Sequence, residues 1–127
     1  MDTISRWFRG LICIVVITTM VAGCELQVNN NAILIIENHA EEQIQNVRLQ
    51  YTSSKEVVKI GVLKTKDRYK HIINNKQEDS IILYFTDPSG SEHKEIAIGY
   101  IIKGMKGSTV LMIYKDNEGN WCVKKKK

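Results

Sequence analysis

The chain has 127 residues and a formal net charge of +4 at pH 7. After residue 23 it holds 16 Lys and Arg against 13 Asp and Glu, and four of these lysines are Lys124–Lys127, so the remaining body is nearly neutral. Without a basic patch interleaved with aromatic residues, nucleic-acid binding is not indicated. Residues 24–127 suffice for one domain with a core of its own.

The N-terminal segment has the layout of a secretory signal. Arg6 and Arg9 precede the apolar run Leu11–Gly23, and small residues end that run. A charged region, an apolar region and a small-residue cleavage site define such signals. The run is shorter than the roughly 20 residues of a membrane-spanning helix. We expect a signal helix over residues 1–23, and the alternative is an uncleaved anchor that begins at Trp7. Both place the rest of the chain outside the cytoplasm.

The end of this segment carries a more specific motif. Val21-Ala22-Gly23-Cys24 resembles the lipobox of bacterial lipoproteins. The resemblance implies cleavage between Gly23 and Cys24, acylation of the Cys24 sulfur, and attachment to the outer face of the cytoplasmic membrane. The overall layout is also similar to that of small surface lipoproteins of Gram-positive bacteria. Residues 24–31, with three consecutive asparagines, form a polar tether that spans at most a couple of nanometres at about 3.3 Å per residue.

The first half of the domain shows a β pattern. Ile33–Ile36 is a continuous apolar run, which predicts a strand buried on both faces. Ile44–Tyr51 alternates, with inward-facing residues Val47, Leu49 and Tyr51. Glu56–Leu63 predicts a third strand with Val58, Ile60 and Val62 on one face, and Gly61 within it indicates a bulge or a close backbone approach. The more polar stretch Arg68–Ile73 suits a sheet edge, where charge discourages pairing with other chains.

The second half continues this pattern. Ser80–Thr86 is a second continuous apolar run, and Asp87-Pro88-Ser89-Gly90 matches a type I turn. Glu95–Ile102 alternates, which places Ile96, Ile98 and Tyr100 on one face. After a loop at 103–107, strands are predicted at 108–114 and 120–123, joined by a hairpin turn at 116–119.

About eight short strands separated by turns are typical of an all-β sandwich or a small barrel. We predict a small antiparallel β-sandwich, immunoglobulin-like, over residues 32–123. A basic tail, residues 124–127, follows it. This tail either lies on anionic lipid or wall polymer or is a solvated end.

Residues with catalytic potential are scattered. His39, His71 and His93 each stand alone in the sequence, and His39 and His93 fall in predicted turns beside acids, as solvated surface residues do. Cys122 is the one cysteine left after removal of the signal and lipidation of Cys24, and its neighbours indicate a small residue on a strand. We therefore expect that the protein has no enzymatic activity, no cofactor and no metal site.

A loop is the better candidate for function, because loops on a rigid scaffold often carry binding residues. The candidate partner-binding loop is glycine-flanked, with an exposed Met105 as an adaptable apolar contact; its residues are Lys103, Gly104, Met105, Lys106 and Gly107. The alternative is a flexible hairpin with a half-buried methionine.

The leading hypothesis is a lipid-anchored, non-enzymatic module that binds a protein partner at the outer face of the cytoplasmic membrane. An exclusion or immunity lipoprotein is one such role. The alternatives are an envelope accessory that binds wall polymer or a small ligand, and an assembly component that uses a strand edge such as Arg68–Ile73.

Overall fold

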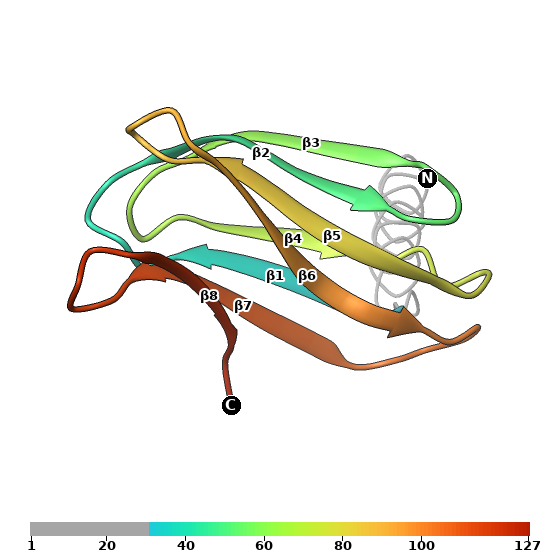
Figure 1. The fold of residues 1–127 in the computed structure, drawn as a ribbon. Coiled ribbons are helices and arrows are strands. Elements are labelled where there is room, and N and C mark those ends of the chain that lie inside the picture. The colour runs from blue at the N-terminus through green and yellow to red at the C-terminus, as the bar shows by residue number, and fades with distance from the viewer. Residues whose placement is uncertain (1–30) are drawn as a thin grey trace, which may run out of the picture. The chain divides into compact units, whose positions relative to one another are not determined.

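Alternating apolar and polar residues build eight strands in residues 31–127, the part of the chain that the computed structural model describes (Figure 1). The strands are β1 (Ile33–Asn38), β2 (Ile44–Tyr51), β3 (Val57–Leu63), β4 (Arg68–Ile72), β5 (Asp79–Thr86), β6 (Glu92–Ile101), β7 (Ser108–Lys115) and β8 (Trp121–Lys125). The predicted signal helix and tether lie outside the described residues, apart from Asn31.

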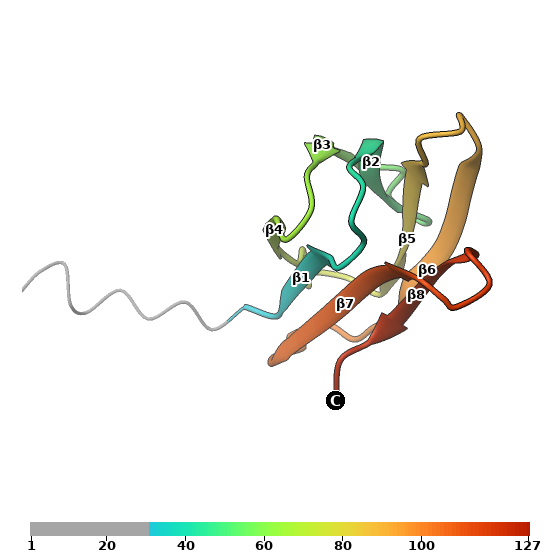
Figure 2. The ribbon, with the colours of Figure 1, turned by 90° about the vertical axis from the view of Figure 1, so that its left-hand side faces the viewer.

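The strands form two four-stranded sheets packed face to face (Figures 1 and 2). One has the order β4-β1-β7-β8, and we call it the β1 sheet; the other has the order β3-β2-β5-β6, and we call it the β2 sheet. All pairings are antiparallel except that of β1 with β7, which is parallel. The predicted all-β sandwich of about eight strands is confirmed. Its first strand lies inside a sheet, whereas the first strand of a constant-type immunoglobulin domain lies at a sheet edge.

The core lies between the sheets and is supplied by every second residue of the strands. Residues 31–127 form one compact unit. The two continuous apolar runs, in β1 and β5, bury only their inward residues fully, and their outward residues are half-buried. The largest fully buried side chains come from both sheets: Tyr51, Phe85, Leu34, Ile36, Ile44, Leu49, Ile73, Ile81, Leu83, Ile101, Leu111 and Ile113.

A bulge in β3 corrects one predicted face. Val47 pairs with Gly61 while the next residue of β2 pairs with Lys59, so β3 carries one extra residue at this point. Gly61 has a φ of 91°, a conformation that glycine adopts without strain. An extra residue reverses the alternation beyond it. Val62 is therefore half-exposed and Leu63 is buried, so the bulge at Gly61 is confirmed and the inward position of Val62 is wrong.

Two register shifts in β6 overturn a second predicted face. Between its pairs with β5, β6 carries one extra residue near Ala97 and another near Gly99. Each shift reverses which side of the strand faces the core. Ile98 is buried as predicted, but Ile96 and Tyr100 point to solvent and are 70% and 59% exposed.

Other predicted features agree with the structure. β4 lies at an edge of its sheet, and the turn after β5 closes with a hydrogen bond from Gly90 N to Asp87 O of 3.0 Å. The hairpin turn between β7 and β8 is present. β8 continues to Lys125, and Lys126 N donates to Val110 O, so the first three lysines of the predicted tail extend the β1 sheet.

Candidate functional site

Within residues 31–127, no group of three or more His, Cys, Asp or Glu side chains could hold a metal ion. The same residues include no helix long and apolar enough to span a membrane. Every fully buried side-chain nitrogen or oxygen in this part of the chain has a hydrogen-bond partner.

His71 joins the two sheets. On β4 it points toward the core, and its Nε2 lies 2.6 Å from the hydroxyl of Tyr51 on β2. That hydroxyl also accepts a hydrogen bond from Asn74 N at 3.0 Å. The hydroxyl can donate its proton to Nε2 of a neutral His71 ring. Burial lowers the pKa of His71 below its usual 6.5, in agreement with the neutral ring. The role of His71 is structural.

His93 joins the sheets on the opposite side of the sandwich. It lies in β6, not in a turn, and its Nε2 is 2.7 Å from Asp87 Oδ2. Its ring stacks on Phe85 at 4.8 Å, and Trp121 of β8 packs edge-on against Phe85. Predicted as solvated surface, His93 instead is only 28% exposed because strand β6 begins at Glu92.

The carboxylate of Asp87 is held by several donors. His93 Nε2, the hydroxyl and N–H of Ser89, and Ser91 N all bond to it. The bond from His93, followed by that from Ser89, lowers the pKa of Asp87 from 3.8 to about 2. A fully ionised carboxylate with four bonds stabilises the turn and is not poised for acid–base chemistry.

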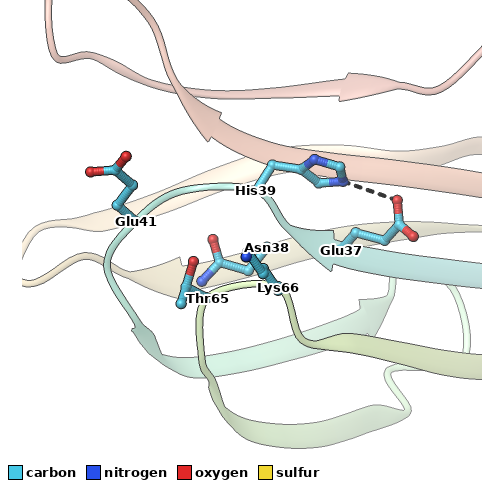
Figure 3. Close-up of a pocket in the computed structure, with 6 residues that line it drawn as sticks. All are labelled: Glu37, Asn38, His39, Glu41, Thr65 and Lys66. Atoms are coloured by element: carbon cyan, nitrogen blue, oxygen red, sulfur yellow. Dashed lines mark hydrogen bonds and ion pairs between the residues drawn. The ribbon is translucent and has the colours of Figure 1, made fainter.

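The third histidine lines a hollow at one end of the sandwich (Figure 3). His39 Nε2 is 3.1 Å from Glu37 Oε1. This bond lowers the pKa of Glu37, and the charges of Lys126 and Arg68 act in the same direction. The hollow has a volume of about 390 Å³ and its lining residues are Glu37, Asn38, His39, Glu41, Thr65 and Lys66.

The walls of this hollow are fixed by Asn38, which is fully buried. Its Nδ2 donates to Glu42 O and Leu63 O, and its Oδ1 accepts from Ala40 N. Lys66 N donates to Asn38 O at 2.8 Å, so the β1–β2 and β3–β4 loops are bonded to each other. The lining includes both acidic and basic groups. Its charge therefore does not select for either an anion or a cation.

The cysteines fall on both sides of the described boundary. Cys122 lies on β8 as predicted, is free, and has its Sγ 3.8 Å from Asp116 Oδ2. Gly23 and Cys24, the predicted cleavage and lipidation residues, lie outside the described residues, so lipid attachment stays a prediction.

The loop 103–107 crosses from one sheet to the other and is not a hairpin. Met105 is half-buried and packs against the core, so its predicted exposure is wrong and the alternative of a half-buried side chain holds. Asn75 fixes the loop, because it accepts from Gly104 N at 2.9 Å and donates to Met105 O at 2.7 Å. Lys103 and Lys106 are exposed.

The most distinctive surface lies along β6. We define the β6 patch as Ile96, Tyr100 and Ile102, which are 70%, 59% and 57% exposed. Ile82 of β5 pairs with Ile96 and extends this apolar surface from the edge strand toward the middle of the β2 sheet. Beside the patch, Tyr100 lines a hollow of about 290 Å³ together with Glu78 and Ser53. A hydrogen bond with Glu78 raises the pKa of Tyr100, so its hydroxyl stays protonated.

Sequence reasoning missed this patch because it assumed an unbroken alternation in β6. A signal was present in Gly99, since a glycine inside a strand indicates a bulge, as it does for Gly61. Applied to β6, that rule would have indicated an interrupted alternation, so that Ile96 and Tyr100 need not both face the core.

Comparison with known proteins adds information on the fold. No family model matches the chain, and no curated protein is similar to it. Among solved structures, a protein from Eubacterium rectale determined by NMR is similar, with a TM-score of 0.58 and 14% sequence identity. The match covers 78% of this chain and 91% of that chain. At this identity the similarity supports the β-sandwich fold alone.

Proposed function

We propose that this protein is a lipid-anchored, non-enzymatic surface module that binds a protein partner at the outer face of the cytoplasmic membrane. The β6 patch carries the proposal. It has three large apolar side chains, each more than half exposed: Ile96 and Tyr100 lie on the edge strand β6, and Ile102 follows directly after it. Exposed apolar clusters of this kind mark interaction surfaces, and aromatic residues are enriched at them.

The chemistry of the patch favours a protein over a wall polymer. Isoleucine side chains have no hydrogen-bonding groups, whereas a glycan or polyol-phosphate chain offers mainly hydroxyls and charge. The neighbouring groups of the hollow are already bonded: Asp79 accepts from Ser53 N and Ser80 N at 2.8 Å each. Burial opposes ionisation of Asp79, but these bonds lower its pKa to about 2. An apolar patch beside satisfied polar groups suits an apolar protein surface.

A concrete role consistent with this proposal is an exclusion or immunity lipoprotein that blocks a membrane-embedded channel. The support is geometric: the tether of residues 24–31 keeps the domain within a couple of nanometres of the bilayer, at about 3.3 Å per residue. A membrane-embedded partner is within that reach.

Chemical cross-linking followed by purification of the full chain from intact membranes tests the proposal. Ile96→Glu places a charge at the most exposed residue of the patch and is expected to abolish recovery of the partner. Val62→Glu is the matched control, because Val62 is also about half exposed but lies on β3, at the opposite edge of the same sheet.

Equal recovery with both variants would contradict the patch as the binding surface. The lipid anchor is tested separately: Cys24→Ala should release the protein or leave its signal uncleaved. Unchanged membrane retention with a cleaved signal would contradict the anchor while leaving the β6 patch result intact.

A further inference from the structure

The outer face of the β1 sheet has an unusual arrangement of side chains. Leu34, Ile36, Leu111 and Ile113 point into the core, so the residues between them on β1 and β7 point outward. These outward residues form a half-buried apolar stripe along the two central strands, and they are Ile33, Ile35, Val110, Met112 and Tyr114.

Basic residues occupy both edges of this face. On β4, Arg68 and Lys70 alternate with the inward Tyr69 and are exposed. On the other edge, Lys124 pairs with Met112, and Lys126 N bonds to Val110 O. The central stripe is therefore flanked on both sides by positive charge.

The register aligns these groups in rows across the sheet. Lys70 pairs with Ile35, and Ile35 pairs with Val110, so one row runs from a lysine through two apolar residues toward Lys126. The next row joins Arg68, Glu37, Met112 and Lys124. Glu37 is the one acid at the outward positions of the four described strands; its carboxylate is hydrogen-bonded to His39 at 3.1 Å and paired with Arg68 at 3.6 Å.

A hollow of about 220 Å³ opens on the same face between His39, Met112, Tyr114 and Lys124. The Lys124 ammonium lies 5.0 Å from the centre of the Tyr114 ring. An aromatic ring beside a lysine, above an apolar floor, is the combination that residues at a membrane interface present. The exposed Ile72 at the end of β4 adds a further apolar group to this face.

We propose that the outer face of the β1 sheet lies on the anionic headgroups of a phospholipid bilayer, with the apolar stripe at the headgroup level and the two basic edges on the phosphates. This inference rests on the proposed function, because the lipid at Cys24 would bring the domain to such a surface. The two sheets then have separate roles, because the β6 patch belongs to the other sheet and stays free for a protein partner.

Charge distinguishes this occupant from a second copy of the chain. Two copies stacked through this face would place the same basic edges opposite each other, which is unfavourable. An anionic leaflet instead attracts each lysine, and the attraction fades within a Debye length of about 8 Å in physiological salt. A face with positive charge at both edges matches an anionic surface.

Vesicle sedimentation with a chain that begins at residue 25 tests the proposal without any lipid on the protein. We expect binding to vesicles of phosphatidylcholine with about 30 mol% phosphatidylglycerol and little binding to phosphatidylcholine alone. Lys70→Glu combined with Lys124→Glu should weaken binding by at least about 25-fold, at roughly fivefold per lysine. The matched control, Lys59→Glu combined with Lys94→Glu, has the same net charge but alters exposed positions of the β2 sheet. It should change binding less than about threefold.

Equal loss in the two double variants would overturn the proposal, because net charge alone would then explain binding. Binding to a soluble glycerol-phosphate polymer as tight as binding to vesicles would also overturn it in favour of wall polymer. Circular dichroism of each variant checks the fold. Since the chain used lacks Cys24, failure here leaves the lipid anchor and the β6 patch standing, and failure of either leaves the vesicle result standing.

Discussion

Tyr51 and His71 connect the two sheets of the sandwich through one hydrogen bond of 2.6 Å. Tyr51 belongs to β2 and His71 to β4, so the bond spans the core near the open side between β3 and β4. The Tyr51 hydroxyl accepts from Asn74 N and shares a hydrogen bond with His71 Nε2, and Tyr51 is buried. The contact ties sheet packing to the protonation state of one imidazole.

Stability should therefore fall in mild acid. The pKa of His71 is lower in the folded protein than its usual 6.5, chiefly because of burial. At His71 the unfolded chain therefore binds a proton more readily than the folded chain. The contribution of His71 to the free energy of unfolding is complete above pH 6.5 and decreases as the pH falls below that value. His71→Gln keeps an acceptor for Tyr51 without a titrating group and should flatten the decrease. Urea unfolding at about pH 7.5 and about pH 5.5 measures this difference. An unchanged pH dependence in His71→Gln would assign the effect to another group.

Removing the hydroxyl tests the same bond directly. Tyr51→Phe should lower the free energy of unfolding by about 1–2 kcal/mol, because it leaves Asn74 N without its acceptor. Since the phenyl ring keeps the packing, the loss should come from the polar contact alone. The measurement is the urea midpoint at constant m-value, and a change below about 0.3 kcal/mol would contradict the assignment.

Asp87 should support stability at neutral pH and lose that role in strong acid. Asp87→Ala removes the acceptor of bonds from Ser89, Ser91 and His93. We expect a loss of about 2–3 kcal/mol at pH 7. The pKa of Asp87 is lowered from 3.8 to about 2, so the wild-type advantage is present above about pH 4 and disappears as the pH falls through about 2. Glu118→Ala, an exposed carboxylate in the next hairpin, is the control and should change stability by less than about 0.5 kcal/mol.

Among the polar residues that line the hollow at His39, Asn38 should be the one whose substitution lowers the stability of the protein most. It is fully buried and donates to Glu42 O and Leu63 O, so Asn38→Ala leaves two carbonyls without their donors. The expected cost is about 2–4 kcal/mol. Asn117→Ala, in an exposed turn, is the control and should be nearly neutral. Comparable effects of the two substitutions, measured by thermal unfolding, would contradict the role of Asn38.

The two strand glycines should respond differently to alanine. Gly61→Ala forces a side chain into a positive φ of 91° and should cost about 1–2 kcal/mol. At Gly99 the added methyl would meet only the Ile96 side chain at 4.0 Å, with no positive φ, so Gly99→Ala should be tolerated. Denaturant midpoints of the two variants give the comparison, and equal costs would contradict the conformational explanation.

The sequence was informative where structure is local. Period-two alternation and short apolar runs located the strands, and Asp87-Pro88-Ser89-Gly90 identified the turn after β5, because these signals depend on neighbouring residues. The faces of β3 and β6 were less predictable. Their bulges are set by pairing with β2 and β5, and one extra residue reverses every later position.

The candidate site depended on contacts between distant residues. Nothing near His71 in the sequence indicates Tyr51, which lies 20 residues away on the other sheet. Likewise, nothing near Asn38 in the sequence indicates its partner Leu63 O, which is 25 residues away. The β6 patch and the outer face of the β1 sheet also needed the strand registers. The lipobox at Val21–Cys24 stays a prediction from the sequence.

The parallel pairing of β1 with β7 sets a limit on when the protein can fold during synthesis. Ile33 pairs with Ser108, so the first strand has no neighbour on that side until most of the chain has been made. Contacts this distant in sequence close slowly, because the entropy of a long loop must be lost first. Secretion channels accept extended chains, so late folding suits the export that we propose for this protein.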